Sequence, residues 1–374
     1  MNDLLTTEEL RRELTAHLDT VTPPPGDLGA VHRRGRRLRT RRLAGPGLLA
    51  AAAVGVGALV LSQTSAPAPD RGSTGPAPTG VVATDGQVDL SHGLRAYASP
   101  GERLYLGGTS LPLTEGMDYL DTDAVATRYG LVYTDPSGRP ELLGELGRPE
   151  PLGPASKAPP GFHPTIKADA FRPVVVWATL HGQELTVTAY DLKVRKVVAT
   201  TDITCSDDCS EFVIDGTDSG AVFLRNPKGT TVWNYDTGES FMLAGPRTRI
   251  ADVRNKTVLF DGPAPSGRMD GWLFVPGPVD GELSHDGRYL LYWSDTLQPT
   301  VDGGAKPIKL DLPVKATFFT FDTDGSVLAA TSGNPSRVFD CALATGTSTS
   351  SGSCHQIGEM ATPHGDPMFI GNDM

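Results

Sequence analysis

Four cysteines are the residues of this chain with the most specific chemistry. Cys341 and Cys354 flank a Thr/Ser/Gly-rich segment, where a cross-strand disulfide would stabilise a hairpin by about 3 kcal/mol. Cys205 and Cys209 could form a second disulfide or a metal site. Nearby acidic residues could complete the metal site: Asp202, Asp207, Asp208 and Glu211. Two cysteines without a second pair or a histidine are poor zinc ligands. We therefore expect two local disulfides, Cys205–Cys209 and Cys341–Cys354, and an oxidising compartment.

Three acidic clusters could instead bind calcium: Asp121 to Asp123, Asp215 with Asp218, and Asp322 to Gly325. The last cluster begins like an EF-hand loop, but its twelfth position is Gly333, where a bidentate Glu is required. Asp and Gly are also the usual residues of hairpin turns. Turn formation accounts for all three clusters, so we predict no metal site.

Catalytic patterns are absent from the sequence. The eight histidines are scattered, without a His-Glu-x-x-His motif, and there is no Gly-x-Ser-x-Gly. We expect His285 to support a turn. The tryptophans lie in or beside apolar runs and are expected in the core rather than on a sugar-binding surface: Trp177, Trp233, Trp272 and Trp293. We predict no catalytic residue and no cofactor.

Short strands must position these residues. Over the 294 residues from Val81 to Met374, β-branched and aromatic runs alternate with Gly, Asp, Pro and Ser. The clearest runs are Pro173 to Trp177, Leu185 to Tyr190 and Arg288 to Trp293. No helical periodicity of useful length follows residue 62. This pattern is typical of an all-β domain.

Two motifs recur within that domain. An Asp-Gly turn followed by an apolar strand occurs at 283–293 and 321–330. A strand that ends in an aromatic residue and Asp occurs around 133–135, 190–191, 235–236 and 339–340. Together they resemble the inner and outer strand pairs of TolB-like and WD-repeat β-propeller blades. At about 42 residues a blade, the resemblance implies a β-propeller of about seven blades, with six or eight as alternatives.

The resemblance also places the blades. Six are expected near 117–147, 165–200, 211–243, 249–280, 281–313 and 316–358. The seventh would join 87–114 to a final strand at 368–370 and so close the ring. The segment 147–164 contains six prolines. We expect it to be a loop between blades and the preferred contact surface, because such loops often carry binding.

A membrane helix is predicted before the β-domain. The nineteen residues from Leu43 to Leu61 carry no charge and would span roughly 28 Å as a helix, about the thickness of a bilayer core. Seven arginines precede it: Arg33, Arg34, Arg36, Arg37, Arg39, Arg41 and Arg42. Basic flanks stay in the cytoplasm, so the N-terminus is expected inside and the β-domain outside. A cleaved signal peptide and a twin-arginine signal are the alternatives.

The flanking segments complete this layout. Residues 1–42 contain nine Arg and six Asp or Glu, a net charge of +3 against −11 for the whole chain. They include a short leucine-rich helix near 8–18 that ends before three prolines. Residues 62–80 are rich in Pro, Gly and Ser and are expected to form a stalk. We expect the arginines to contact anionic lipid, and residues 1–42 to be available to a cytoplasmic protein partner. We expect no nucleic-acid binding.

This order of segments resembles a group of actinobacterial single-pass membrane proteins with an extracytoplasmic β-propeller, some of them associated with sigma factors. A zinc-type anti-sigma domain is excluded, because no cysteine precedes Cys205. We expect a non-enzymatic, membrane-anchored binding or sensing module for an unidentified extracytoplasmic ligand or protein. A non-zinc anti-sigma regulator and a propeller-based lyase or hydrolase are the alternatives.

Overall fold

The structure is a computed structural model of the chain. The chain divides into two units, Met1–Thr74 and Gly75–Met374. The described residues all belong to the second unit: 88–99, 103–112, 124–135, 137–156, 165–182, 184–204, 209–266, 269–277, 281–292, 294–301, 305–343, 351–362 and 366–370. The predicted cytoplasmic segment, membrane helix and stalk lie outside them. Among the described residues, no helix has the length and apolar character that a membrane span requires.

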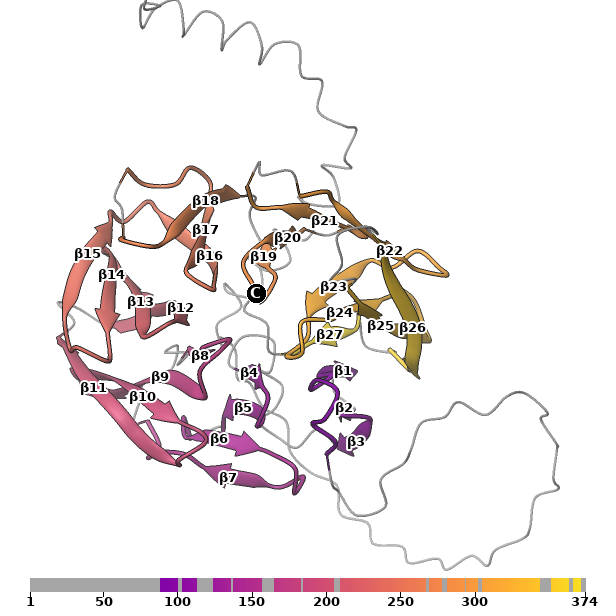
Figure 1. The fold of residues 1–374 in the computed structure, drawn as a ribbon. Coiled ribbons are helices and arrows are strands. Elements are labelled where there is room, and N and C mark those ends of the chain that lie inside the picture. The colour runs from indigo at the N-terminus through magenta and orange to yellow at the C-terminus, as the bar shows by residue number, and fades with distance from the viewer. Residues whose placement is uncertain are drawn as a thin grey trace, which may run out of the picture. The chain divides into compact units, whose positions relative to one another are not determined.

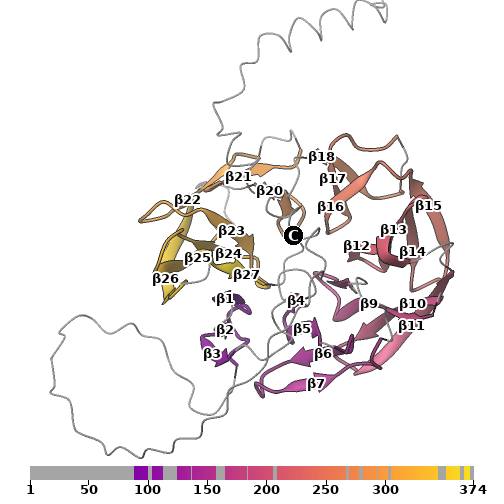
Figure 2. The ribbon, with the colours of Figure 1, turned by 180° about the vertical axis from the view of Figure 1, so that it is seen from behind.

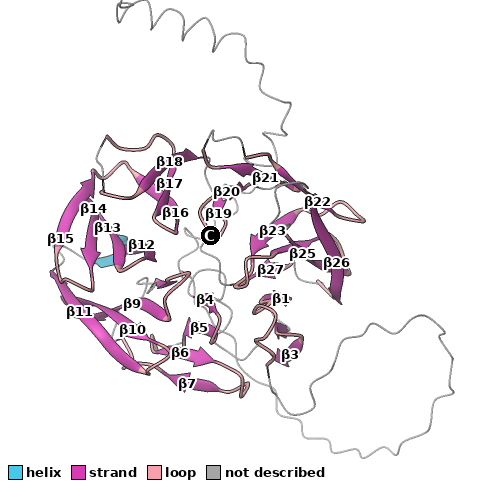
Figure 3. Cartoon of the chain, viewed as in Figure 1, coloured by secondary structure: helices cyan, strands magenta, loops and turns pink. Residues whose placement is uncertain are grey.

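The described part is almost entirely β-structure, as predicted. Figure 3 shows strands, loops and one short 3-10 helix, η1 (Cys209–Glu211). The sheets comprise four of four strands, one of three and one of eight. The eight-stranded sheet consists of two antiparallel halves joined by one parallel strand pair. Taking these halves separately gives seven strand groups, which we number 1 to 7 in chain order.

Groups 1 to 4 each contain four antiparallel strands. Group 1 comprises β1 (Tyr97–Ser99), β2 (Arg103–Leu106), β3 (Thr109–Pro112) and the C-terminal β27 (Met368–Phe369). Group 2 comprises β4 (Ala124–Thr127), β5 (Gly130–Thr134), β6 (Pro140–Leu143) and β7 (Pro149–Pro151). Group 3 comprises β8 (Ile166–Ala168), β9 (Val174–His181), β10 (Glu184–Asp191) and β11 (Lys196–Thr204). Group 4 comprises β12 (Val213–Asp218), β13 (Ala221–Asn226), β14 (Gly229–Asn234) and β15 (Ser240–Ala244).

Groups 5 to 7 are less regular. Group 5 comprises β16 (Arg249–Arg254), β17 (Thr257–Asp261) and β18 (Leu273–Gly277), which runs parallel to β17. Group 6 comprises β19 (Glu282–Leu283), β20 (Tyr289–Leu291), β21 (Thr296–Pro299) and β22 (Ile308–Asp311). Group 7 comprises β23 (Phe318–Phe321), β24 (Val327–Ala330), β25 (Ser336–Ala342) and β26 (Ser351–Met360). The parallel pair β22–β26 joins the last two groups.

The groups follow one another around a ring in both views (Figures 1 and 2). The first strands of neighbouring groups contact each other, in the pairs β4–β8, β8–β12, β12–β16 and β16–β19. They lie nearest the centre of the ring (Figure 1). The ring closes where β27 pairs with β1, with Phe369 opposite Tyr97 and Met368 opposite Ala98. This confirms the predicted closing strand at 368–370.

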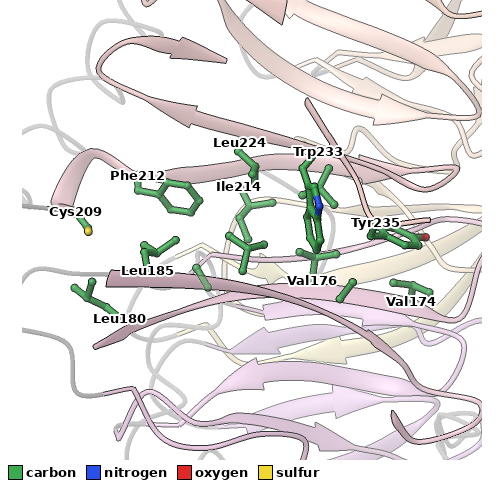
Figure 4. Close-up of a cluster of buried hydrophobic side chains, with 14 residues drawn as sticks. Val174, Val176, Leu180, Leu185, Cys209, Phe212, Ile214, Leu224, Trp233 and Tyr235 are labelled. Atoms are coloured by element: carbon green, nitrogen blue, oxygen red, sulfur yellow. The ribbon is translucent and has the colours of Figure 1, made fainter. Parts of the chain in front are cut away.

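Apolar side chains fill the interfaces between groups. The described residues contain seven buried clusters, and each cluster joins two consecutive groups. The largest lies between groups 3 and 4, where Leu185 and Val176 face Ile214 and Trp233 (Figure 4). The cluster of Tyr97, Phe318 and their neighbours joins group 7 to group 1. The core is therefore a chain of interfaces around the ring.

Burial differs between the second and the fourth strand of group 3. Seven of the eight residues of β9 are buried, because both faces of this strand are covered by neighbouring groups. None of the nine residues of outer strand β11 is buried. This explains why β9 reads as a nearly continuous apolar run and β11 as a mixed one.

One sequence expectation is wrong in part. The segment 147–164 was expected to be a loop, but β7 (Pro149–Pro151) pairs with β6 at the edge of group 2. Alternate residues of an edge strand direct N–H groups away from the neighbour, so prolines two positions apart are tolerated there. Residues 157–164 of this segment lie outside the described residues.

The disulfide predictions have a mixed outcome. Cys341 on β25 and Cys354 on β26 are directly opposite each other and bonded, with Cα atoms 4.0 Å apart, as predicted. Cys209 is also disulfide-bonded. Its predicted partner, Cys205, lies outside the described residues. No described cysteine is free.

The expectations for the tryptophans and acidic clusters can be followed in the same way. Trp177 and Trp233 are buried, and Trp272 is partly buried against the cluster between groups 4 and 5. Trp293 and the cluster 121–123 lie outside the described residues. Among described residues no group of three or more His, Cys, Asp or Glu side chains could hold a metal ion. Asp215 lies within β12 rather than in a turn and pairs with Arg225 at 2.9 Å.

Candidate binding pocket

A pocket of about 130 Å³ is built from five of the seven groups. Each contributes residues from its first strand or the turn that follows it, and group 3 adds Val174 of β9 and Leu192, which follows β10. The lining residues include Arg128 of group 2, Arg172 of group 3, Arg254 of group 5, His285 of group 6 and Thr323 of group 7. Because the first strands lie nearest the centre of the ring (Figure 1), the pocket lies on the inner side of these groups, and we call it the central pocket.

Group 2 contributes a tight hairpin. Gly130 has a positive φ, and a side chain there would meet the Leu143 carbonyl oxygen, so the turn after β4 requires glycine. Thr127 fixes the turn by donating to the Gly130 carbonyl oxygen at 2.8 Å. Arg128 is at the tip, exposed, with its guanidinium carbon 5.3 Å from the centre of the Tyr129 ring. The hairpin therefore holds a cation at the pocket rim.

Group 3 contributes a turn organised by Asp169. Its carboxylate accepts the backbone N–H groups of Phe171 at 3.0 Å and Arg172 at 2.9 Å. Burial raises the pKa of Asp169. The Arg172 side chain donates to Asp236 of group 4 at 2.7 Å and lies over the Tyr235 ring. This hydrogen bond raises the pKa of Arg172, so the guanidinium stays charged.

Group 5 contributes Arg254, whose placement follows from its turn. The two residues after it, Asn255 and Lys256, both have positive φ, as a two-residue hairpin loop requires. Their N–H groups donate to Asp218 of group 4, at 3.2 and 2.8 Å. Arg254 is 5% exposed, and its Nε lies 3.7 Å from the Asp252 carboxylate. It is a buried cation at the pocket wall.

His285 of group 6 lies beside this cation. Burial, and then the charge of Arg254, lower the pKa of His285 to about 4, against the smaller opposite effects of Asp324 and Asp286. The imidazole is therefore neutral at pH 7. The structure places His285 in the turn between β19 and β20, as expected, and also in the pocket lining.

Carboxylates at the inner ends of the groups serve a different purpose. Each accepts a backbone N–H of the next group: Asp218 from Lys256, Asp252 from Leu283 at 2.8 Å, Glu282 from Phe321 at 3.2 Å, and Asp322 from Arg95 at 2.9 Å. None of these four lines the pocket. These carboxylates link successive groups. The sequence analysis expected Asp218 and Asp322 only to form turns, and that expectation was incomplete.

Comparison with known proteins identifies no function. No family model matches the chain, and no curated protein matches it. Among solved structures, it is similar to TolB from Acinetobacter baumannii (13% identity, TM-score 0.35), with 73% of this chain and 64% of that one covered. A functionally unknown protein from Desulfotomaculum acetoxidans gives 14% identity and a TM-score of 0.36, covering 77% and 98%. The chain thus spans less than two thirds of TolB's length.

Sequence inspection did not find the pocket residues other than His285. Arg128, Arg172 and Arg254 are separated by 44 and 82 positions and share no motif. A signal was nevertheless present, since each lies at or near the turn after the first strand of its group. Aligning these turns between the repeats would have brought the three arginines and His285 together.

Proposed function

We propose that the second unit is a seven-bladed β-propeller that binds a ligand at its central pocket, as the outer domain of a membrane-anchored, non-enzymatic binding module. Seven strand groups, seven buried interfaces and the β27–β1 pairing support the blade count. The anchor rests on the uncharged Leu43–Leu61 segment and the arginines before it.

The observation that carries the binding role is the composition of the pocket. Its wall comes from five groups, with lining residues between Val125 and Thr323, and polar side chains from separate turns share it. Convergent polar groups in a concave site are typical of ligand binding. One oxygen of Asp169 accepts two backbone amides and the other lies 3.5 Å from the Tyr235 hydroxyl, and burial beside Arg254 keeps His285 neutral at pH 7. This arrangement favours binding over general acid–base chemistry.

Photo-crosslinking in cells tests the pocket. Tyr129 lines it, whereas the exposed Tyr292 does not. We would replace each in turn by a photoreactive phenylalanine analogue in the full chain, irradiate, and analyse adducts by mass spectrometry. An adduct at position 129 and none at 292 is expected. Equal adducts at both positions, or none at 129, would contradict the proposal.

Cysteine labelling tests the membrane arrangement. Arg128→Cys places an exposed thiol at the pocket rim, and Thr6→Cys places one in the predicted cytoplasmic segment. A membrane-impermeant maleimide should label position 128 in intact cells, and position 6 only after permeabilisation. The reverse pattern would overturn the predicted orientation and leave the pocket's binding role intact.

A further inference from the structure

We infer that the central pocket binds a small oxyanion, a carboxylate or a phosphate, through Arg128, with Arg172 and Arg254 completing the site. The inference rests on the proposed binding role of this pocket and adds the chemical class of its ligand. It does not depend on the membrane anchor.

The charge of the lining points to an anion. Its basic side chains are Arg128, Arg172, Arg254 and His285, and its acidic one is Asp169. The chain as a whole has a net charge of −11. Asp236 and Asp252, which do not line the pocket, pair with Arg172 and Arg254, so the lining itself carries three arginines and one aspartate and is opposite in sign to the chain as a whole. Fixed cations at a concave surface concentrate oppositely charged ligands there.

Arg128 is the side chain best placed to receive the ligand. Its guanidinium donates to the Phe171 carbonyl oxygen at 3.5 Å, the limit of a hydrogen bond, and stacks over Tyr129. No described carboxylate forms an ion pair with it. A guanidinium presents a planar fork of donors that matches carboxylate and phosphate oxygens. The Arg128 guanidinium therefore has N–H donors available for a ligand at the pocket rim.

Arg172 and Arg254 add charge at different depths. The side chains of Arg172 and Asp236 are 41% and 46% exposed, so solvent weakens their attraction and an incoming anion can compete for the guanidinium. Arg254 is buried, where a charge acts through a lower effective dielectric, and part of its charge is balanced by the Asp252 carboxylate 3.7 Å away. His285 adds no charge at pH 7, and an anion beside it would favour its protonated form.

A cationic ligand fits less well. Asp169 is the acidic group of the lining, and its carboxylate already accepts the N–H groups of Phe171 and Arg172, with the Tyr235 hydroxyl at 3.5 Å. The inner carboxylates of groups 4 to 7 are bonded to backbone amides. The volume of about 130 Å³ is below the ~300–1,000 Å³ of pockets for drug-sized ligands, so the ligand should be small.

Calorimetric titration of the purified full chain with inorganic phosphate and with succinate tests this inference. The buffer would contain chloride as its only other anion, and choline and glycerol would serve as cationic and neutral probes. We expect saturable one-to-one binding of phosphate or succinate and none of choline or glycerol. Arg128→Gln should weaken the binding about tenfold or more, since a hydrogen bond to a charged group is lost.

Arg195→Gln is the matched control. Arg195 forms an exposed ion pair with Glu150 and has an exposure similar to that of Arg172, but it does not line the pocket. Its variant changes the net charge equally and should bind as tightly as the wild type. An equal loss in both variants, or no anion binding by the wild type, would overturn the inference. A Tyr129 crosslink to an uncharged ligand would overturn the inference while upholding the binding role.

Discussion

The interface between groups 3 and 4 and the interface between groups 5 and 6 hold the ring together by different means. Fourteen buried residues form the first, and three form the second. Across the second, Asp252 accepts the Leu283 N–H at 2.8 Å, and the Asn255 side chain donates to the Asp286 carbonyl oxygen at 2.9 Å. Carboxylate-to-amide hydrogen bonds also link groups 4–5, 6–7 and 7–1, but between groups 5 and 6 they accompany the smallest apolar cluster. A closed ring needs every interface, so the polar one is as necessary as the apolar one.

Strand length explains the difference. β9 and β10 of group 3 have eight residues each, and they present long apolar surfaces to group 4 (Figure 4). β19 and β20 of group 6 have two and three residues. Apolar stabilisation grows with buried area, so the short strands cannot match it. A buried carboxylate bonded to an amide supplies part of the difference.

The largest predicted effect compares one leucine from each interface. Leu185 and Leu283 are both 0% exposed. Leu185→Ala should lower the free energy of unfolding by about 3–5 kcal/mol, because its many apolar neighbours would line a cavity. Leu283→Ala should cost about 2–3 kcal/mol, at the low end of the same series. Urea unfolding of the two variants measures this, and equal losses would remove the distinction between the interfaces.

The next effect concerns Asp252, which is 1% exposed. Asp252→Ala removes the acceptor of the Leu283 N–H and the carboxylate 3.7 Å from Arg254. We expect a loss of about 3–4 kcal/mol, typical of breaking a buried charge pair. Asp252→Asn also removes the charge beside Arg254 but keeps an oxygen for the Leu283 amide, so it should cost about 1 kcal/mol less, the contribution of that hydrogen bond. If the two variants were equally stable, the hydrogen bond across this interface would contribute nothing.

This contrast shows what the sequence could predict. Apolar runs and turn residues predicted the all-β domain, because local patterning is displayed directly by a sequence. The number of strand groups, about seven, and the closing strand at 368–370 were implied by the resemblance of the recurring motifs to propeller blades. The bond from Asp252 to Leu283 spans 31 positions, and an aspartate near a turn reads as a turn residue whether or not its oxygens reach the next group.

The pocket could not be predicted from the sequence either, because it depends on contacts between residues that are far apart in the chain. Arg128 and Arg254 share a wall only because the ring brings groups 2 and 5 to one centre. The prolines of β7 led to a wrong prediction of a loop, because proline is accepted both in loops and in edge strands.

A pH effect extends the comparison to the interface that closes the ring. Asp322 accepts the N–H groups of Leu94 and Arg95, and burial raises its pKa to about 6 from an ordinary 3.8. A raised pKa means that the folded state binds the proton more tightly than the unfolded state. The contribution of Asp322 to stability is therefore present below about pH 3.8 and is lost as pH rises through 6, by up to about 3 kcal/mol.

Asp322→Asn isolates this contribution, because the amide cannot ionise. The free energies of unfolding of wild type and variant would be measured by urea titration from pH 4 to pH 7. Relative to the variant, the wild type should become less stable as the pH rises through this range. If the two curves of unfolding free energy against pH ran parallel, Asp322 would have an ordinary pKa. Its hydrogen bonds to the amides would then offset the effect of burial on that pKa.

The smallest effect is expected at the polar contact of the apolar interface. Arg172 and Asp236 join groups 3 and 4 at 2.7 Å, but both side chains are more than 40% exposed. Exposed ion pairs contribute about 0–1 kcal/mol, so Arg172→Gln should change the free energy of unfolding by less than about 1 kcal/mol. The same variant should weaken oxyanion binding severalfold, because Arg172 lines the pocket. Urea unfolding and calorimetry on one protein sample compare the two effects. A stability loss above about 2 kcal/mol would mean that this interface also depends on its polar contact, and the contrast with Asp252 would then be wrong.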